Sequence, residues 1–282
     1  MTNKLSGLKD LIWAVAIVIC LAALLVGFFF AAISKYAGDR ERPVLALSPA
    51  ASGAPANKSG IDAGVTGSSG GFATVSDGSL KTLSGSSDAG QSYIDSLTFL
   101  VDSSLSSLKT SGLTAGQVWV GGSGLPMPDI ANWTIVYPGD GSSVSPANAA
   151  MVAKPSVLLI AVGSDGMSGL SQEAFISGYE TMIRGILGAS PETKVVCCSV
   201  FPVTDAYTGA DGLDIAGAEQ VNGWIQQVCI DTGAWYADIA YNITAEGKLI
   251  GQYADADGKG LSGTGLSAVM SWIRTHSLSW NR

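Results

Sequence analysis

Hydrophobic and polar positions divide this chain of 282 residues into three parts. The stretch 11–33, LIWAVAIVICLAALLVGFFFAAI, carries no charged residue. The stretch 34–92 is rich in Gly, Ser, Ala and Pro and has no sustained apolar period. From residue 93 onward, short apolar runs alternate with stretches of helical period. The pattern therefore predicts an apolar segment, a linker and one folded domain over 93–282.

The apolar segment 11–33 is long enough to cross a membrane as a helix. Its 23 residues rise about 1.5 Å each, and a bilayer core is about 30 Å thick. A cleaved signal peptide has a shorter apolar core of about 7–15 residues. We therefore predict a short tail over 1–10, an uncleaved single-pass anchor over 11–33, and a flexible tether over 34–92.

The remaining stretch, 93–282, has the pattern of an α/β domain. The runs DSLTFLV, QVWV, WTIVY, SVLLIAV, KVVCCSV and AWYADI predict strands, and SVLLIAV has the continuous apolar character of a strand buried on both faces. Three apolar helix faces alternate with them: Phe175, Tyr179, Met182, Ile183, Ile186 and Leu187; Ala218, Val221, Ile225, Val228 and Cys229; and Leu266, Val269, Met270 and Ile273. This alternation predicts a three-layer α/β/α sandwich around a mostly parallel sheet.

Composition excludes several classes of partner and cofactor. A net charge of −8, with only 13% charged residues, gives no basic surface for nucleic acid. Four cysteines in a chain of this length do not form a disulfide framework, and whether Cys198 and Cys229 meet stays open. The single histidine, His276, cannot build a zinc site alone. We therefore predict neither a metal nor a cofactor.

Four polar loops contain the candidate chemistry. They are Asp102-Ser103-Ser104, Gly121–Gly124, Gly163–Gly166 and Asp257–Gly260. Gly, Ser and Asp are ordinary turn residues, so each loop alone is explained as a turn. In parallel α/β sheets, however, functional residues gather at the carboxyl ends of the strands.

Taken in order, the loops resemble the motifs of the SGNH (GDSL-type) hydrolases. YIDSLTFLVDSSLSSL resembles the first block of that family, a strand that ends in Gly-Asp-Ser. SVLLIAVGSDGMSGLSQEAFISGYETMIRGILGASPETKVVCCSVFPV resembles the third block and its sequel, and DGKGLSGTGLSAVMSWIRTHSL resembles the fifth, Asp-x-x-His. The resemblance covers about 93–278 and implies a flavodoxin-like fold and an esterase, lipase or carbohydrate deacetylase ancestry.

The resemblance also implies roles for individual residues. The nucleophile of the family falls on Ser103 and the preceding Asp on Asp102, while Val101 replaces the usual Gly. The oxyanion-hole Gly falls on Gly122 or Gly124, and the oxyanion-hole Asn falls on Asp165. The triad acid falls on Asp257, and the triad base falls on Gly260, which has no side chain.

Two departures from the family pattern predict lost activity. A serine hydroxyl needs a base to take its proton, and removal of a triad base costs about a millionfold in turnover. His276 cannot substitute, because it lies about 20 Å further along the last helix. An ionised Asp165 only accepts hydrogen bonds and repels a developing oxyanion. Asp165, Asp257 and Lys259 stay open as unusual bases.

Three functions are compatible with these residues. The first is a catalytically degenerate domain that binds a cell-envelope or extracellular glycan, an acylated small molecule or a protein partner near Ser103. Here Trp119, Trp133 and Trp235 would stack on sugar rings or, as ordinary core residues, be buried. The second is an esterase or carbohydrate O-deacetylase with a non-standard base. The third is a structural or adhesive surface protein.

The tether and the resemblance together predict a location. Basic residues lie on both sides of the apolar segment, and long domains cross the membrane largely regardless of charge. Anchored relatives with a spacer act outside a bacterial cytoplasmic membrane. We therefore expect the amino terminus inside and the domain outside.

Overall fold

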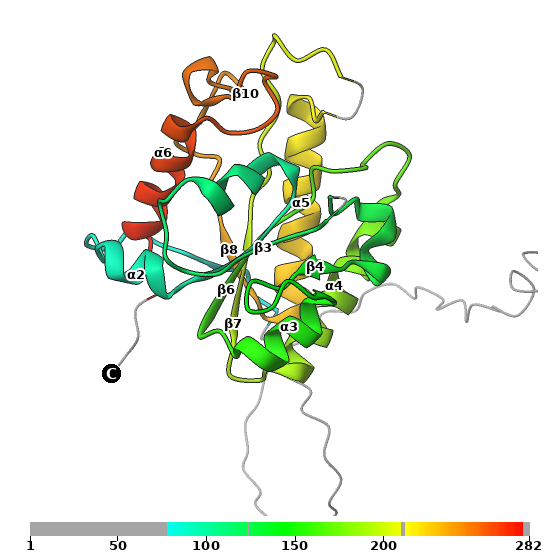
Figure 1. Cartoon of the computed structure of the whole chain (residues 1–282). Helices are drawn as coiled ribbons and strands as arrows, with labels where there is room; N and C mark the ends of the chain where they lie inside the picture. Colours follow the sequence, from blue (N-terminus) through cyan, green and yellow to red (C-terminus); the bar gives the residue numbers. More distant parts are fainter. Residues whose placement is uncertain (1–77, 123, 210–211, 279–282) are drawn as a thin grey trace, which may run out of the picture. The chain divides into compact units, whose positions relative to one another are not determined.

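A six-stranded parallel sheet forms the centre of the domain. The computed structural model describes residues 78–122, 124–209 and 212–278. All neighbouring strands of the sheet are parallel (Figure 1). In spatial order they are β1 (Lys81–Thr82), β8 (Trp235–Ala237), β7 (Lys194–Cys198), β6 (Val157–Ala161), β2 (Thr98–Val101) and β3 (Val118–Val120).

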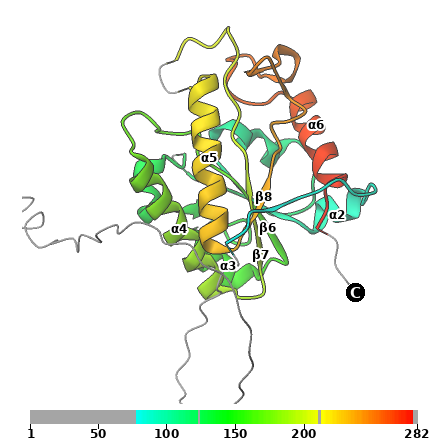
Figure 2. The same cartoon turned by 180° about the vertical axis from the view of Figure 1, so that it is seen from behind.

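Helices cover both faces of this sheet. Figures 1 and 2 show α3, α4 and α5 on one side and α2 and α6 on the other. The helices are α2 (Gln91–Ser96), α3 (Pro146–Ala153), α4 (Gln172–Ala189), α5 (Ile215–Thr232) and α6 (Gly263–Arg274), with 3-10 turns η1 (Ser103–Thr110), η2 (Met127–Asn132) and η3 (Gly251–Tyr253). The order β3-β2-β6-β7-β8 is the flavodoxin-like order, so the predicted three-layer architecture is confirmed.

Successive residues along each central strand point into different cores. Leu100, Leu158 and Ile160 pack with α3, α4 and α5, whereas Phe99 and Leu159 pack with α2 and α6. This alternation follows from the two-residue period of a strand. Because helices cover both faces, the central strand β6 is apolar and buried at every position, as its sequence predicts.

The predicted helices are confirmed, and one predicted strand is not part of the main sheet. The three helical faces correspond to α4, α5 and α6. Of WTIVY, only β4 (Ile135–Val136) is a strand, and it pairs with β5 (Ser143–Val144) in a separate ribbon. The pattern did not reveal α3 or the small hairpin β9 (Thr244–Ala245) and β10 (Lys248–Leu249).

The folded domain begins earlier than residue 93, so the predicted end of the linker at residue 92 is wrong. Strand β1 pairs in parallel with β8, and the Leu83 N–H donates to the Tyr236 carbonyl at 2.9 Å. The Asp88 carboxylate forms an ion pair with Arg274 on α6. A two-residue strand leaves no periodic signal in a Gly- and Ser-rich stretch, which explains the error.

The proposed membrane segment, residues 11–33, lies outside the described residues, as do the tail and most of the linker. Within 78–122, 124–209 and 212–278, no helix has the length and apolar character that a membrane crossing requires.

The cysteines of the domain are buried free thiols. Cys197 and Cys229 pack in the core beneath α4 and α5, whereas Cys198 points to the opposite face of the sheet. Burial raises the pKa of the Cys198 thiol. Cys198 and Cys229 therefore do not form the disulfide that the sequence left open.

Candidate active site

Ser103 and Asp165 lie at the carboxyl ends of two neighbouring strands. Ser103 begins η1 immediately after β2, and Asp165 follows β6, which pairs with β2. Asp102 is the N-cap of η1 and accepts a hydrogen bond from the Ser104 N–H. The loops that carry the predicted nucleophile and the predicted oxyanion residue are therefore adjacent, as expected from a parallel sheet.

Asp102 is a buried hub that fixes these two loops. Its side chain accepts from the Ser104 N–H at 3.0 Å and the Ser104 hydroxyl at 2.6 Å through Oδ1. Through Oδ2 it accepts from the N–H groups of Gly163 (3.1 Å) and Ser164 (2.9 Å) and from the Ser164 hydroxyl (2.7 Å). Burial, followed by the charge of Asp165, raises the pKa of Asp102, whereas the hydrogen bonds from Ser104 and Ser164 lower it; the net shift is upward. Asp102 therefore joins the loops that contain Ser103 and Asp165.

The Asp165 carboxylate contacts both donors of Ser103. The Ser103 hydroxyl lies 2.5 Å from Asp165 Oδ1, and the Ser103 N–H donates to Oδ2 at 3.0 Å. Lys259 Nζ lies 3.1 Å from the same Oδ1, and the side chains of Lys259 and Asp165 are each 12% exposed. Ser103 itself is exposed at the surface. The serine is thus accessible, but its hydroxyl and its N–H are both bound to an anion.

The same carboxylate occupies the expected oxyanion hole. In an acyl-transfer site, the N–H of the nucleophile is aimed at the developing oxyanion. Here that N–H is aimed at Asp165 Oδ2, and a Cβ placed on Gly124 would lie 3.9 Å from the same oxygen. Gly124 has φ +82°, a conformation that glycine adopts without strain, and it pairs with Gly122 in a short bridge. Gly124 therefore lies beside the Asp165 carboxylate, and Gly122 is joined to Gly124 by the bridge.

The position of the missing base is filled by another residue. A Cβ on Gly260 would lie 2.3 Å from Asp255 Oδ2. Asp255 accepts from the N–H groups of Gly258 (3.0 Å) and Gly260 (3.2 Å) through Oδ1. A side chain at position 260 would therefore require the exposed Asp255 carboxylate to shift. Sequence reasoning missed Asp255, although the spacing of the two acids in DADGKG was a signal.

Asp257, the predicted triad acid, stabilises a turn. It is exposed, and its Oδ1 accepts from the Lys259 N–H at 2.8 Å. A hydrogen bond shared with Asp255 is the main cause that lowers the pKa of Asp257, whereas burial and that same contact raise the pKa of Asp255. These contacts give Asp257 a clear structural role at the Lys259 backbone.

His276 lies at the far end of α6 from this loop, as expected. Its ring stacks on Trp272 with centroids 3.9 Å apart, and Nδ1 lies 2.9 Å from the Trp272 carbonyl oxygen. These contacts make it a helix-end residue, as its position in the sequence suggested.

A surface depression of about 410 Å³ adjoins the oxyanion loop. Gly122 and Gly124 form one side, and its lining includes the exposed polar residues Asp129, Asn132 and Ser143. Trp133 borders it but is only 4% exposed, and its indole N–H donates to the Pro126 carbonyl at 2.8 Å. Trp119 is fully buried. Both indoles are therefore core residues and not platforms for sugar stacking.

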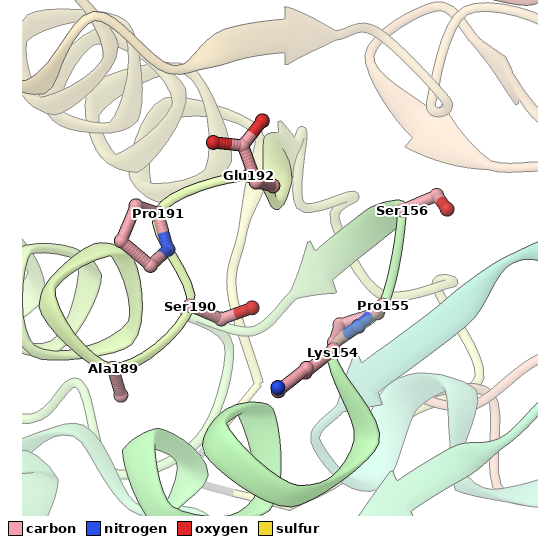
Figure 3. A pocket seen from close by; sticks show the side chains of 7 residues that line it. All are labelled: Lys154, Pro155, Ser156, Ala189, Ser190, Pro191 and Glu192. Atoms are coloured by element: carbon pink, nitrogen blue, oxygen red, sulfur yellow. The ribbon is translucent and has the colours of Figure 1, made fainter.

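A second pocket lies at the amino ends of the strands, opposite the candidate site. Figure 3 shows its lining, which comes from the ends of α3 and α4 and the segments that lead into β6 and β7: Lys154, Pro155, Ser156, Ala189, Ser190, Pro191 and Glu192. None of the predicted site residues borders it. Because it lies at the amino ends of the strands, it is not part of the candidate site.

Comparisons with known proteins gave structural matches only. No family model and no curated protein matches the chain. Similar solved structures include the periplasmic domain of a lipopolysaccharide acetyltransferase from Salmonella ser. Paratyphi A (13% identity, 66% of this chain and 83% of that one, TM-score 0.42). Others are a GDSL-like lipase from Bacteroides thetaiotaomicron (14%, 66% and 89%, 0.40) and a carbohydrate esterase family 3 protein from Talaromyces cellulolyticus (18%, 57% and 68%, 0.37). At this level of similarity the matches establish no activity for this chain.

Proposed function

We propose that this chain is an SGNH-like hydrolase domain that binds a ligand without hydrolysing it. The observation that carries the proposal is the Asp165 carboxylate, which holds the hydroxyl and the N–H of Ser103 together. An acyl group that approached Ser103 would meet an anion where a donor is required. The absence of a side chain at Gly260, where Asp255 fills the space, supports the same conclusion.

A working esterase is the second candidate, and one distance favours it. A general base must lie within hydrogen-bonding reach of the proton it takes, and Asp165 Oδ1 lies 2.5 Å from the Ser103 hydroxyl. The same carboxylate, however, also occupies the Ser103 N–H through Oδ2. A carboxylate is a weak base for a serine hydroxyl, and Asp165 would have to leave the Ser103 N–H before an oxyanion could accept from it, so binding without turnover fits the geometry better.

The depression beside Gly122 and Gly124 is where we place the ligand. It presents a carboxylate, an amide and a hydroxyl from Asp129, Asn132 and Ser143. Such groups pair with the hydroxyls of a sugar, and this favours a cell-envelope glycan over an apolar ligand. A protein partner, or a purely structural or adhesive role, would fit if no glycan binds.

One experiment tests turnover and binding in the same samples. The full-length chain, Ser103→Ala and Asn132→Ala are incubated with insoluble acetylated cell-wall glycan. Released acetate and sedimented protein are then measured. We expect equal, background release of acetate from the wild type and Ser103→Ala, and weaker sedimentation of Asn132→Ala. Release that depends on Ser103 would favour the esterase, and no sedimentation of the wild type would refute glycan binding.

We further propose that residues 11–33 anchor the domain on the outer side of a bacterial membrane. The support is the uncharged length of that segment and the long Gly-, Ser- and Ala-rich stretch that follows it. A protease added to intact cells should release the domain. Protection of the domain in intact cells, with cleavage only after lysis, would contradict this orientation.

A further inference from the structure

We infer that the ligand is a sugar with an acyl or alkyl chain, and that the chain lies in a groove along α4. The inference rests on the proposed function, because it places the sugar in the depression beside Gly122 and Gly124. It goes beyond that function by naming the chemical class of the ligand, an amphiphile with a polar head and an apolar tail.

The α4 groove adjoins the depression. It is a hollow of about 520 Å³ between η2, the start of α3 and α4, and these two helices pack beside each other (Figures 1 and 2). Trp133 lines both hollows. Turn η2 also contributes to both, with Asp129 and Asn132 in the depression and Ile130 and Ala131 in the groove. One elongated ligand can therefore occupy both hollows.

The lining of the groove favours an apolar occupant. It contains no charged residue. Two of its hydroxyls are already bonded to the backbone: the Thr181 hydroxyl donates to the Ser177 carbonyl at 2.8 Å, and the Ser145 hydroxyl accepts from the Asn148 N–H at 3.2 Å. A polar group that is buried without a partner is costly, so a hydrocarbon chain suits this lining better than a second sugar.

Two glycines of α4 shape the groove. A Cβ on Gly178 would lie 2.4 Å from Ile130, so the missing side chain lets η2 approach the helix. A Cβ on Gly185 would be in ordinary contact with Ala147, 3.8 Å away, so the side chain of a larger residue would extend into the groove. The lining runs along α4 from Ala174 to Gly185, about 16 Å at about 1.5 Å per residue, and this elongated shape fits a chain.

Apolar surface continues past the groove on α3. Of the three large hydrophobic side chains that are exposed in the described residues, Met151 and Val152 belong to this helix. Met151 lies four residues after Ala147, which lines the groove, so these two residues share one face of the helix. A long tail would therefore cover apolar surface that is otherwise exposed to water.

The test is photolabelling of the full-length chain in lipid nanodiscs with an octyl β-glucoside that carries a diazirine in its alkyl chain. Peptide mapping locates the adducts. Gly185→Leu fills the groove. Gly188→Leu is the matched control, because Gly188 lies on the same helix but does not line the groove, and its Cβ would have no atom within 4 Å. Leucine is a better helix former than glycine, and circular dichroism checks that both variants fold.

We expect adducts on η2 and α4 in the wild type and in Gly188→Leu. In Gly185→Leu they should fall by at least about tenfold, since exclusion of even two methylenes from the groove costs that much affinity. Asn132→Ala should weaken labelling about two- to tenfold through loss of a hydrogen bond to the sugar. Unlabelled octyl β-glucoside should compete, and methyl β-glucoside at the same concentration should not. Because the lipid is the same for every variant, partitioning of the probe cancels in these comparisons.

Groove adducts that persist in Gly185→Leu would overturn the inference. Equal competition by methyl and octyl β-glucoside would also overturn it, but would leave sugar binding, and hence the proposed function, intact. A wild-type dimer in analytical ultracentrifugation that Gly185→Leu abolishes would assign the groove to a second copy of the chain and contradict the inference. Groove labelling that Asn132→Ala does not change would refute the sugar site of the proposed function and with it the head of the inferred ligand, so the failures are distinguishable.

Discussion

Replacement of Asp102 by alanine should lower the free energy of unfolding by about 3 kcal/mol. Asp102 is 1% exposed and is the acceptor for three backbone N–H groups, those of Ser104, Gly163 and Ser164. A buried donor without its partner costs about 1–3 kcal/mol. Relief of the burial of a charge offsets part of the sum. A loss of this size is a large part of a typical total stability of about 5–15 kcal/mol.

Urea unfolding of the full-length chain, followed by tryptophan fluorescence, measures this loss. Asp140→Ala is the matched control, because Asp140 accepts from the N–H and hydroxyl of Ser142 in the same local pattern but at the surface. Its loss should cost far less than that of Asp102, since water replaces the acceptor. Equal effects of the two substitutions would show that Asp102 is not the hub of the site.

The sign of the pH dependence follows from the raised pKa of Asp102. Burial makes the native state bind this proton more tightly than the unfolded state does. The contribution of Asp102 to stability therefore falls as pH rises from about 3.8, its ordinary value, through the raised folded pKa. The stability difference between wild type and Asp102→Asn should decrease with pH over that window.

Histidine at position 260 alone should destabilise the domain without giving activity. The new Cβ would lie 2.3 Å from Asp255 Oδ2, so the Asp255 carboxylate must shift, which strains its hydrogen bonds from the N–H groups of Gly258 and Gly260. Forced overpacking of this kind costs about 1–3 kcal/mol. Asp165 would still hold Ser103, so the rate of p-nitrophenyl acetate hydrolysis should stay at the Ser103→Ala background.

Activity through a histidine should require three changes together: Gly260→His, Asp255→Gly and Asp165→Asn. The second makes room for the ring and the third supplies an oxyanion donor. The triple variant should hydrolyse the ester faster than the single Gly260→His variant, because histidine then provides the base. Hydrolysis by the single Gly260→His variant would show that neither Asp165 nor Asp255 blocks the site.

The arrangement of the site was predictable from the sequence where it depends on strand order. Ser103 and Asp165 each follow an apolar run, and the carboxyl ends of neighbouring parallel strands bring such residues together. The helices α4, α5 and α6 were predictable because each has a continuous apolar face. Strands β1 and β4, of two residues each, are too short to show a period.

The side-chain contacts that determine the chemistry could not be predicted from the sequence. The sequence resemblance assigned Asp165 to the oxyanion hole. It did not show that the two carboxylate oxygens of Asp165 accept from the hydroxyl and the N–H of Ser103, because this contact depends on the side-chain rotamer. Gly260 read as a missing residue, because the Gly-rich loop gives no sign that Asp255 fills the space. The sequence also did not show that Lys259 Nζ contacts the oxygen of Asp165 that the Ser103 hydroxyl contacts.

The reactivity of Ser103 in the wild-type chain tests the central claim most directly. The full-length protein and Ser103→Ala are incubated with a fluorophosphonate, and intact mass and peptide mapping report the adduct. Because Asp165 holds both donors of Ser103 and no base deprotonates its hydroxyl, we predict no adduct at Ser103 under conditions that label an active serine hydrolase completely. A stoichiometric adduct at Ser103 of the wild type would contradict the account.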